Sequence, residues 1–183
     1  MLKQNNWYVI TGAPHSGKTT LINLLNNLGY KTRDETARLF IDREMAKGKT
    51  LEEIRGDELG FQREVLQMKI ITEKEADCEE VIFWDRGIPD SDAYYELISS
   101  KLEEALIIEE EFVEAIKNSK YKKVFLLDYY PYSKDYARIE SEEEQIKLHS
   151  LLEDSYRKLK AEIIKVPVMN SDEERLNFIL NNL

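Results

Sequence analysis

The residue types best suited to binding a phosphate group lie close together near the start of the chain. Residues 12–19, GAPHSGKT, have the spacing G-x-x-x-x-G-K-[ST]. Gly12 and Gly17 permit the backbone angles that turn successive amide N–H groups towards one anion, and Lys18 adds a positive charge. The Thr19 hydroxyl can ligate Mg²⁺. The pattern predicts a loop that binds a nucleotide triphosphate with Mg²⁺, and the alternative is a glycine-containing turn with an incidental lysine.

The surroundings of this loop favour the phosphate-binding interpretation. An apolar run, WYVIT, precedes the loop, and an amphipathic segment, KTTLINLLNNL, follows it. A strand followed by a helix places the positive end of the helix dipole at the loop. The residues expected to contact the nucleotide phosphates are Gly12, Ala13, Pro14, His15, Ser16, Gly17, Lys18, Thr19 and Thr20.

Two acidic residues at the ends of apolar runs compete for the role of metal ligand. Asp85 ends VIFWD and is followed by Arg86 and a glycine, whereas Asp128 ends KVFLLD and is followed by two tyrosines and a proline. An arginine beside the acid suits phosphate chemistry, so Asp85 is favoured as the partner of Thr19 at the metal. Arg86 either faces a phosphate or pairs with one of the many acids, and the residues alone leave both roles open.

The acidic residue that precedes the helix near Pro89 has a second possible role, which is to cap that helix. Asp90 and Ser91 fill this role more readily than Asp85 does. The capping alternative therefore counts little against a metal-binding role for Asp85.

The segment TRDETARLF offers groups for an acceptor substrate. Glu35 can accept a hydroxyl proton and Arg38 can orient a substrate or a phosphate. The plainer interpretation, slightly favoured by the residues alone, is a helix start with acids first and an arginine one turn on. Gln62 lies on a mostly apolar helical segment and is expected to be exposed.

An unusual stretch, YYPYSKDYARIESEEEQ, lies within a generally acidic region. It contains four tyrosines, Lys134 and Arg138. Either Lys134 or Arg138 reaches a transferring phosphate from a mobile flap, or the tyrosines pack as an ordinary aromatic loop. The residues do not decide between these alternatives.

Apolar, β-prone runs alternate with helical segments along the whole chain. The expected strands are residues 7–11, 30–34 (weak), 81–85, 123–128 and 162–166. The expected helices are residues 18–28, 35–47, 51–78, 90–98, 101–118, 142–160 and 171–182. This alternation is typical of a parallel sheet covered on both faces, a three-layer α/β/α sandwich. Ligands bind beyond the carboxyl ends of such strands.

Composition limits the kinds of partner. The chain has 183 residues, enough for one domain, and a formal net charge of −10. That charge disfavours nonspecific binding to nucleic acid or an anionic membrane, so an anionic ligand needs a local positive site. No apolar run is long enough to span a membrane, the first residues have no signal-peptide pattern, and the single cysteine excludes an internal disulfide. A cytoplasmic protein is expected.

The motifs, taken in order, resemble a known family. They are GAPHSGKTT, GYKTRDETARLFI, FQREVL, VIFWDRGIPDSDAYY, KVFLLDYYPYSKDYARIESEEEQ and VPVMNSDEERLNFIL. The chain resembles the P-loop kinase-like ATPases of the AAA type that group with the nicotinamide-riboside kinase domain of NadR. The resemblance implies an α/β P-loop NTPase fold of the nucleoside-kinase kind, with about five parallel strands. It also implies a single domain, residues 1–183, with a lid-like segment near 129–145.

The resemblance also implies roles for particular residues. The implied Mg–nucleotide site contains Lys18, Thr19 and Asp85. The implied substrate side contains Glu35, Arg38 and Gln62. Arg138 becomes a candidate lid arginine, and residues 167–171 border the nucleotide base. NadR-like kinases more often have other residues where DRG stands here, so the substrate's identity is not carried over.

Two functions fit these features. The leading one is a kinase that uses Mg²⁺ and ATP, with GTP possible, to phosphorylate a hydroxyl of a nucleoside-like or other small acceptor. Its candidate catalytic residues are Lys18, Asp85, Glu35, Arg86 and Arg138. The alternative is a regulatory ATP- or GTP-binding NTPase that controls a partner or lipid association. Against it, the chain has no N/T-K-x-D guanine-reading element, and its acidic charge disfavours an anionic membrane surface.

Overall fold

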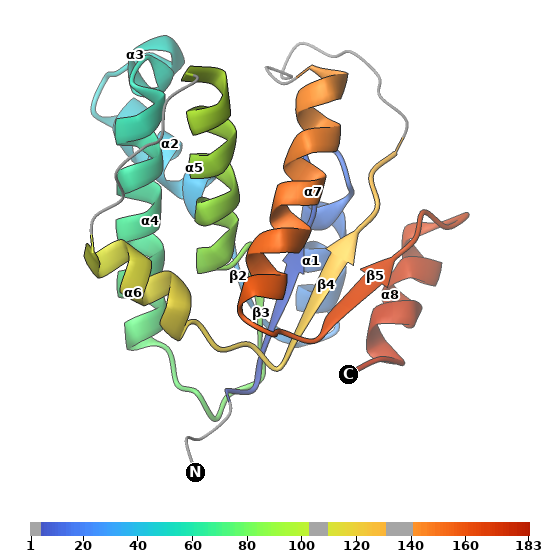
Figure 1. Ribbon diagram of the computed structural model, residues 1–183. Helices are drawn as coiled ribbons and strands as arrows, with labels where there is room; N and C mark the ends of the chain where they lie inside the picture. The colour runs from blue at the N-terminus through green and yellow to red at the C-terminus, as the bar shows by residue number, and fades with distance from the viewer. Residues whose placement is uncertain (1–4, 103–109, 131–140) are drawn as a thin grey trace.

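The computed structural model describes residues 5–102, 110–130 and 141–183, and these contain a five-stranded sheet with helices on both faces (Figure 1). The strands are β1 (Trp7–Thr11), β2 (Lys31–Arg33), β3 (Ile82–Asp85), β4 (Lys123–Leu127) and β5 (Ile163–Val166). They lie in the order β2-β3-β1-β4-β5, and every neighbouring pair is parallel. The predicted strands are confirmed, and the weak second one is shortened to three residues.

The helices follow the predicted order. They are α1 (Lys18–Asn27), α2 (Thr36–Ala46), α3 (Leu51–Arg55), α4 (Glu58–Glu75), α5 (Ile88–Leu102), α6 (Glu110–Asn118), α7 (Glu142–Lys158) and α8 (Asp172–Leu180). The predicted helix 90–98 is longer at both ends. The predicted helix 101–118 overlaps the end of α5 and then α6, with residues 103–109 outside the described part.

The single helix predicted for residues 51–78 is wrong, because the chain forms two helices there. Thr50 and Glu53 form a capping box that starts α3. Asp57 then caps α4 by accepting a hydrogen bond from the amide of Gly60 at 2.9 Å. Gly56 therefore ends α3, and Asp57, the next residue, starts α4.

Alternate strand residues face opposite layers, which gives the sandwich its two cores. On one face, Tyr8 and Ile10 of β1 pack with buried residues of α1 and α8. On the other face, Trp7 and Val9 pack with Trp84 and with residues that precede β4 and end α7, and α5 and α7 cover Leu126. The three-layer α/β/α fold is confirmed, and Figure 1 shows α1 and α8 on the side of the sheet opposite α5 and α7.

None of the described helices has the length and the apolar composition needed to cross a membrane. The division into one domain, residues 1–183, with a lid-like segment near 129–145 stays a prediction. Within that segment, residues 131–140 lie outside the described part, and residues 142–145 form the first turn of α7.

Candidate active site

The loop that joins β1 to α1 has the backbone geometry that its glycines predict. Gly12 has a φ of 152° and Gly17 a φ of 84°, values that side-chain-bearing residues rarely adopt. A Cβ atom on Gly12 would also lie 2.7 Å from the carbonyl oxygen of Leu127, at the end of β4. Other residues at these two positions would therefore strain the loop, and at Gly12 they would also clash with β4.

Lys18 opens α1 and turns its side chain back over the loop. Its Nζ donates hydrogen bonds to the carbonyl oxygens of Gly12 and Ala13, at 3.0 and 2.9 Å, and to Ser16 Oγ at 3.2 Å. Burial, helped by the charge of Arg86, lowers the pKa of Lys18 to about 8, against the opposing effect of nearby carboxylates. A phosphate placed in the loop would favour the charged ammonium.

Asp85 ends β3 on the floor of the same region. Its Oδ1 is buried and has no hydrogen-bond partner among the described residues, and burial raises its pKa to about 6 against the effect of Lys18. Asp85 and Thr19 line the same cavity of about 190 Å³. A buried carboxylate oxygen without a described partner, in a cavity that a threonine also lines, fits the oxygen ligands that Mg²⁺ or its bound water requires.

Asp128, the rejected alternative, is arranged differently. Its side chain is 48% exposed and lies 3.8 Å from His149 Nε2, outside both cavities of the loop region. Capping of α5 falls to Asp90, as the spacing indicated, because its Oδ2 accepts a hydrogen bond from the amide of Gly87 at 3.0 Å.

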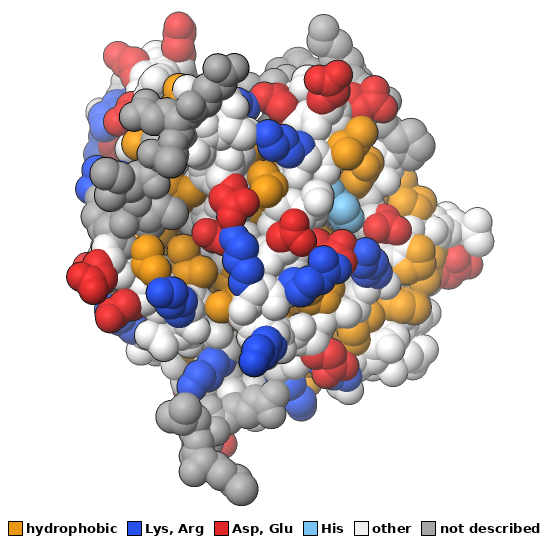
Figure 2. Space-filling model, in the orientation of Figure 1, with side chains coloured by type: hydrophobic (Ala, Val, Ile, Leu, Met, Phe, Trp, Pro, Cys, Tyr) orange, Lys and Arg blue, Asp and Glu red, His pale blue; other side chains and the backbone are white. Residues whose placement is uncertain are grey.

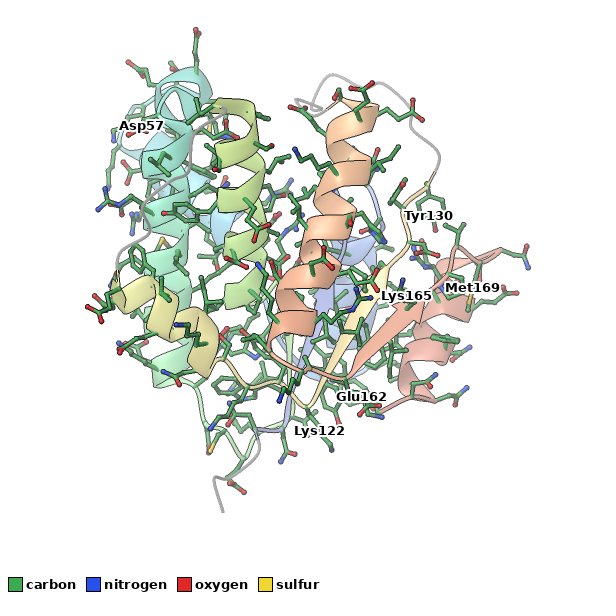
Figure 3. All side chains as sticks on the ribbon, viewed as in Figure 1. Asp57, Lys122, Tyr130, Glu162, Lys165 and Met169 are labelled. Atoms are coloured by element: carbon green, nitrogen blue, oxygen red, sulfur yellow. The ribbon has the colours of Figure 1, made fainter. Side chains whose placement is uncertain are left out.

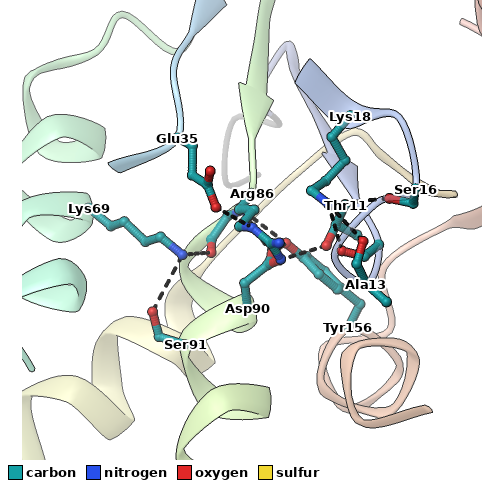
Figure 4. A network of polar contacts seen from close by, with 12 residues as sticks. Thr11, Ala13, Ser16, Lys18, Glu35, Lys69, Arg86, Asp90, Ser91 and Tyr156 are labelled. Atoms are coloured by element: carbon teal, nitrogen blue, oxygen red, sulfur yellow. Dashed lines mark hydrogen bonds and ion pairs between the residues drawn. The ribbon is translucent and has the colours of Figure 1, made fainter. Parts of the chain in front are cut away.

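Glu35, Arg86 and Asp90 form one polar network (Figure 4). Arg86 Nε donates to Glu35 Oε1 at 3.0 Å, and Arg86 Nη1 donates to Asp90 Oδ1 at 3.2 Å. Asp90 is fully buried and also accepts from Thr11 Oγ1 at 2.6 Å and from the Tyr156 hydroxyl. The charge of Arg86 lowers the pKa of Glu35 against the opposing effect of burial, so Glu35 is a carboxylate at neutral pH.

Two buried tyrosines hold the turn that contains Gly87. The amide of Gly87 donates to the Tyr156 hydroxyl at 3.1 Å, and the amide of Ile88 donates to the Tyr121 hydroxyl at 2.9 Å. A Cβ atom on Gly87 would lie 2.7 Å from one hydroxyl and 2.8 Å from the other. The glycine of the DRG motif is thus required by close packing. Tyr121 in turn donates to Glu73 Oε1 at 2.6 Å.

This arrangement predicts a dependence of stability on pH. Burial raises the pKa of Glu73 to about 7, although the hydrogen bond from Tyr121 opposes it. The folded state therefore binds the Glu73 proton more tightly than the unfolded chain does. Protonated Glu73 stabilises the folded state fully below about pH 4.5, and this stabilisation is lost as the pH rises through 7. We expect the ionisation of Glu73 to lower the free energy of unfolding by roughly 2–3 kcal/mol as the pH rises from acidic to mildly alkaline.

Urea unfolding of the wild type and of Glu73→Gln over a pH series measures this contribution. The variant should keep the hydrogen bond from Tyr121 and show a flatter profile. Asp85 acts with the same sign at lower pH in both proteins, so the difference between the two profiles isolates Glu73. Parallel profiles would contradict the assignment.

The phosphate loop and the Glu35–Arg86 pair open into one cavity of about 460 Å³. Of the predicted site residues, the cavity is lined by Pro14, His15, Gly17, Lys18, Thr19, Thr20, Glu35, Arg38, Gln62 and Arg86. Gly12, Ala13 and Ser16 form the turn behind it, and Asp85 lies in the smaller cavity, which shares Thr19, Glu35 and Arg38. Arg138 lies outside the described residues.

The prediction that Gln62 is exposed is wrong. Its exposed fraction is 4%, and it lies on the face of α4 that lines the cavity. The same face carries Lys69, seven residues further on, which the sequence reasoning missed although two helical turns separate the two residues. Lys69 Nζ donates to the carbonyl oxygen of Gly87 at 2.8 Å, and burial lowers its pKa.

The cavity is electropositive although the chain is acidic. The Lys and Arg residues that line it are Lys18, Arg38, Arg55, Lys69 and Arg86, and the single acidic residue among the described lining is Glu35. Arg55 and Tyr94 belong to this lining and were also missed, because the helices that carry them meet the loop only in three dimensions. This is the local positive site that an anionic ligand needs in a chain with a net charge of −10.

Residues 7–175 match a protein family described as "AAA domain". No curated protein matches the chain. Among solved structures, the chain is similar to the NadR protein in complex with NR, with a TM-score of 0.66, 15% identity, and coverage of 96% of this chain and 47% of NadR. The chain thus spans about half the length of NadR.

Two kinases of similar length have the same architecture. Deoxyadenosine kinase from M. mycoides with bound dATP matches with a TM-score of 0.65, 15% identity, and coverage of 96% of this chain and 98% of that one. Thymidylate kinase from Ehrlichia chaffeensis matches with a TM-score of 0.63, 13% identity, and 98% coverage of both chains. The chain belongs to the AAA-domain family and has the three-layer fold of the P-loop nucleoside and nucleotide kinases.

Proposed function

We propose that this protein is an Mg-ATP-dependent kinase that transfers the γ-phosphoryl group to a hydroxyl of a small, nucleoside-like molecule. The observation that carries the proposal is that the phosphate loop and a carboxylate–arginine ion pair, Glu35 and Arg86, line one cavity. The similar proteins support it, since they include kinases of a nucleoside and of a nucleotide, one with bound dATP.

The nucleotide side of the site is built on the start of α1. The loop amides and Lys18 bind the β- and γ-phosphates, and GTP is a possible alternative to ATP. Thr19 and Asp85 would hold Mg²⁺, Asp85 directly or through water, and a bound Mg²⁺ would supply positive charge to offset the charge that develops on the phosphates. Arg86, which lines the cavity, adds positive charge near the transferred group, and Arg138, which lies outside the described residues, stays a candidate for the same role.

The acceptor side of the site lies between α2, α4 and α5. Phe61 and Val65 provide an apolar wall, and Gln62 and Lys69 provide polar groups on the same helix face. A cavity of about 460 Å³ is in the size range of small-molecule sites. Arg38 and Arg55 line the same space and favour an acceptor with polar or anionic substituents.

Glu35 is the group we assign to the acceptor hydroxyl. Its side chain is 29% exposed and lines both cavities, so it lies between the phosphate loop and the acceptor space. The ion pair with Arg86 fixes its position and keeps it charged. It then orients the hydroxyl and accepts its proton as the oxygen attacks the γ-phosphorus.

Removal of the charge of Asp85 tests the metal assignment. In Asp85→Asn the amide is a weaker ligand for Mg²⁺, so we expect the Mg²⁺ concentration that gives half-maximal activity to rise roughly 10–100-fold. Asp128→Asn is the matched control, because Asp128 directly follows β4, the next strand along the chain, and has a half-exposed side chain. Identical Mg²⁺ dependence of the two variants would contradict the assignment.

The activity itself is tested by product detection. The protein is incubated with Mg-ATP and a pool of nucleosides and vitamins, and each compound is examined by mass spectrometry for the mass of an added phosphoryl group. The proposal predicts at least one phosphorylated product. Slow ATP hydrolysis without any such product, together with tight GTP binding, would favour the regulatory NTPase instead.

A further inference from the structure

Carbonyl groups of the phosphate loop accept hydrogen bonds from side chains that lie far away in the sequence. The carbonyl oxygen of Pro14 accepts a hydrogen bond from Gln145 Nε2 of α7 at 2.9 Å. The carbonyl oxygen of Ser16 accepts one from Arg175 Nη1 of α8 at 2.7 Å. These contacts span 131 and 159 residues, and both donors are buried.

Arg175 connects three parts of the fold. Besides the loop, its Nη2 donates to the carbonyl oxygens of Asp128, which follows β4, and of Val166, which ends β5, at 3.0 and 3.3 Å. The side chain is fully buried, and among the described residues its hydrogen-bond partners are all backbone carbonyls. The guanidinium thus joins the loop to the ends of β4 and β5 through three carbonyls.

The contact between Arg175 and the loop is close. A Cβ atom on Gly17 would lie 3.2 Å from Arg175 Nη1. The guanidinium also lies over the aromatic ring of Tyr130, 5.5 Å from its centroid, and Figure 3 shows Tyr130 beyond the end of β4. The guanidinium is therefore fixed between the loop and the segment that follows β4.

A carbonyl that is held by a hydrogen bond also fixes the orientation of the N–H group of the following residue. The C=O and N–H groups of one peptide unit point in opposite directions, because the unit is planar and trans. A Ser16 carbonyl held outward by Arg175 therefore turns the Gly17 N–H towards the interior of the loop. A Pro14 carbonyl held outward by Gln145 does the same for the N–H of His15.

We propose that Arg175, assisted by Gln145, is a positioning residue for nucleotide binding that holds the phosphate loop in its anion-binding conformation from outside. The proposal rests on the proposed function, since it requires the loop to bind a nucleotide. Neither residue belongs to the G-x-x-x-x-G-K-[ST] motif. The pair thus couples the two C-terminal helices to the phosphate site.

Calorimetric titration with Mg-ATP and with inorganic tripolyphosphate tests the proposal. We expect Arg175→Met to raise both dissociation constants roughly 10–100-fold and Gln145→Met to raise them roughly 3–10-fold, as expected for the loss of a charged and a neutral buried hydrogen bond. Arg175→Lys keeps the positive charge but loses the planar set of guanidinium N–H donors. Its affinity for both ligands should therefore lie between those of Arg175→Met and the wild type.

Two controls separate positioning from general stability. Ile179→Ala on α8 and Leu152→Ala on α7 remove buried core side chains from the same helices. They should lower the melting temperature but leave both dissociation constants unchanged. Amide NMR signals of His15 and Gly17 provide a second readout and should shift in the Arg175 and Gln145 variants alone.

Each result has a defined meaning. Variants of Arg175 and Gln145 that bind Mg-ATP as tightly as the wild type, or controls that lose affinity to the same extent, would overturn the inference and leave the proposed function intact. A wild-type protein that binds neither ligand would overturn both. If Arg175→Met does not fold, Arg175→Lys and Gln145→Met decide the question.

Discussion

Replacement of Lys18 by methionine is expected to lower kcat/KM for ATP roughly 10²–10³-fold or more, the loss typical of one electrostatic stabiliser of a developing charge. The ammonium is held over the loop by two backbone carbonyls and the Ser16 hydroxyl, so it is already in position before any phosphate arrives. Methionine has similar length and lacks the charge. Steady-state kinetics and titration with Mg-ATP measure the effect.

A control is needed because Lys18 is buried and its loss also changes packing. Lys147→Met removes an exposed lysine from α7 and should leave activity unchanged. Circular dichroism melting should show that Lys18→Met remains folded. A folded Lys18→Met protein with wild-type kcat/KM would remove the phosphate loop from the mechanism.

Replacement of Glu35 by glutamine is expected to lower kcat roughly 10²–10⁴-fold while the Kd for Mg-ATP stays nearly unchanged. Glutamine keeps the shape and can still accept a hydrogen bond from Arg86 Nε, but it does not accept a proton. The charge of Arg86 lowers the pKa of Glu35, so the rate of the wild type should not fall with Glu35 protonation until the pH is below the ordinary carboxyl range.

Glu114→Gln is the matched control, because Glu114 is exposed on α6. Single-turnover kinetics separates the chemical step from binding and product release. A Glu35→Gln protein that keeps kcat and loses only acceptor affinity would make Glu35 a binding residue, and the proton acceptor would then have to be sought elsewhere in the cavity.

Most of the fold was predictable because its signals are local. β1, β3 and β4 are continuous apolar runs that end at the loops of the site, and the alternation with helices indicated a parallel sheet. The break between α3 and α4 was missed because a glycine followed by an aspartate can also occur within a helix, and Asp57 acts only through a hydrogen bond to a nearby amide. Capping residues of this kind are visible in the sequence, but many aspartates cap nothing.

The candidate site residues that belong to sequence motifs could be predicted, whereas the residues that tertiary packing brings to the site could not. Lys18, Glu35 and Arg86 line one cavity, as the order of strands and loops suggested. Lys69 was missed because a lysine on a largely apolar helix usually reaches solvent, whereas this one is buried against the carbonyl of Gly87. The contact of Arg175 with the loop bridges 159 residues, and no local pattern predicts it.

The charge distribution agrees with a local positive site on an acidic protein. On the face shown in Figure 2, basic and acidic side chains are interspersed. Elsewhere in the chain, ion pairs join Lys158 to Asp92 and Lys165 to Glu153, and the lysine of each pair is exposed. Ion pairs with solvent-exposed partners contribute little to stability. The cations that line the cavity converge on one space, three of them (Lys18, Lys69 and Arg86) are buried, and Glu35 is the one acidic residue in the described lining.

A crystal structure with Mg²⁺ and a non-hydrolysable ATP analogue tests the central claim most directly. We predict the γ-phosphate within hydrogen-bond distance of Lys18 Nζ, the metal beside Thr19 and Asp85, and the carboxylate of Glu35 facing the open side of the γ-phosphorus. An analogue bound elsewhere on the protein, with the loop between β1 and α1 free of phosphate, would contradict the account.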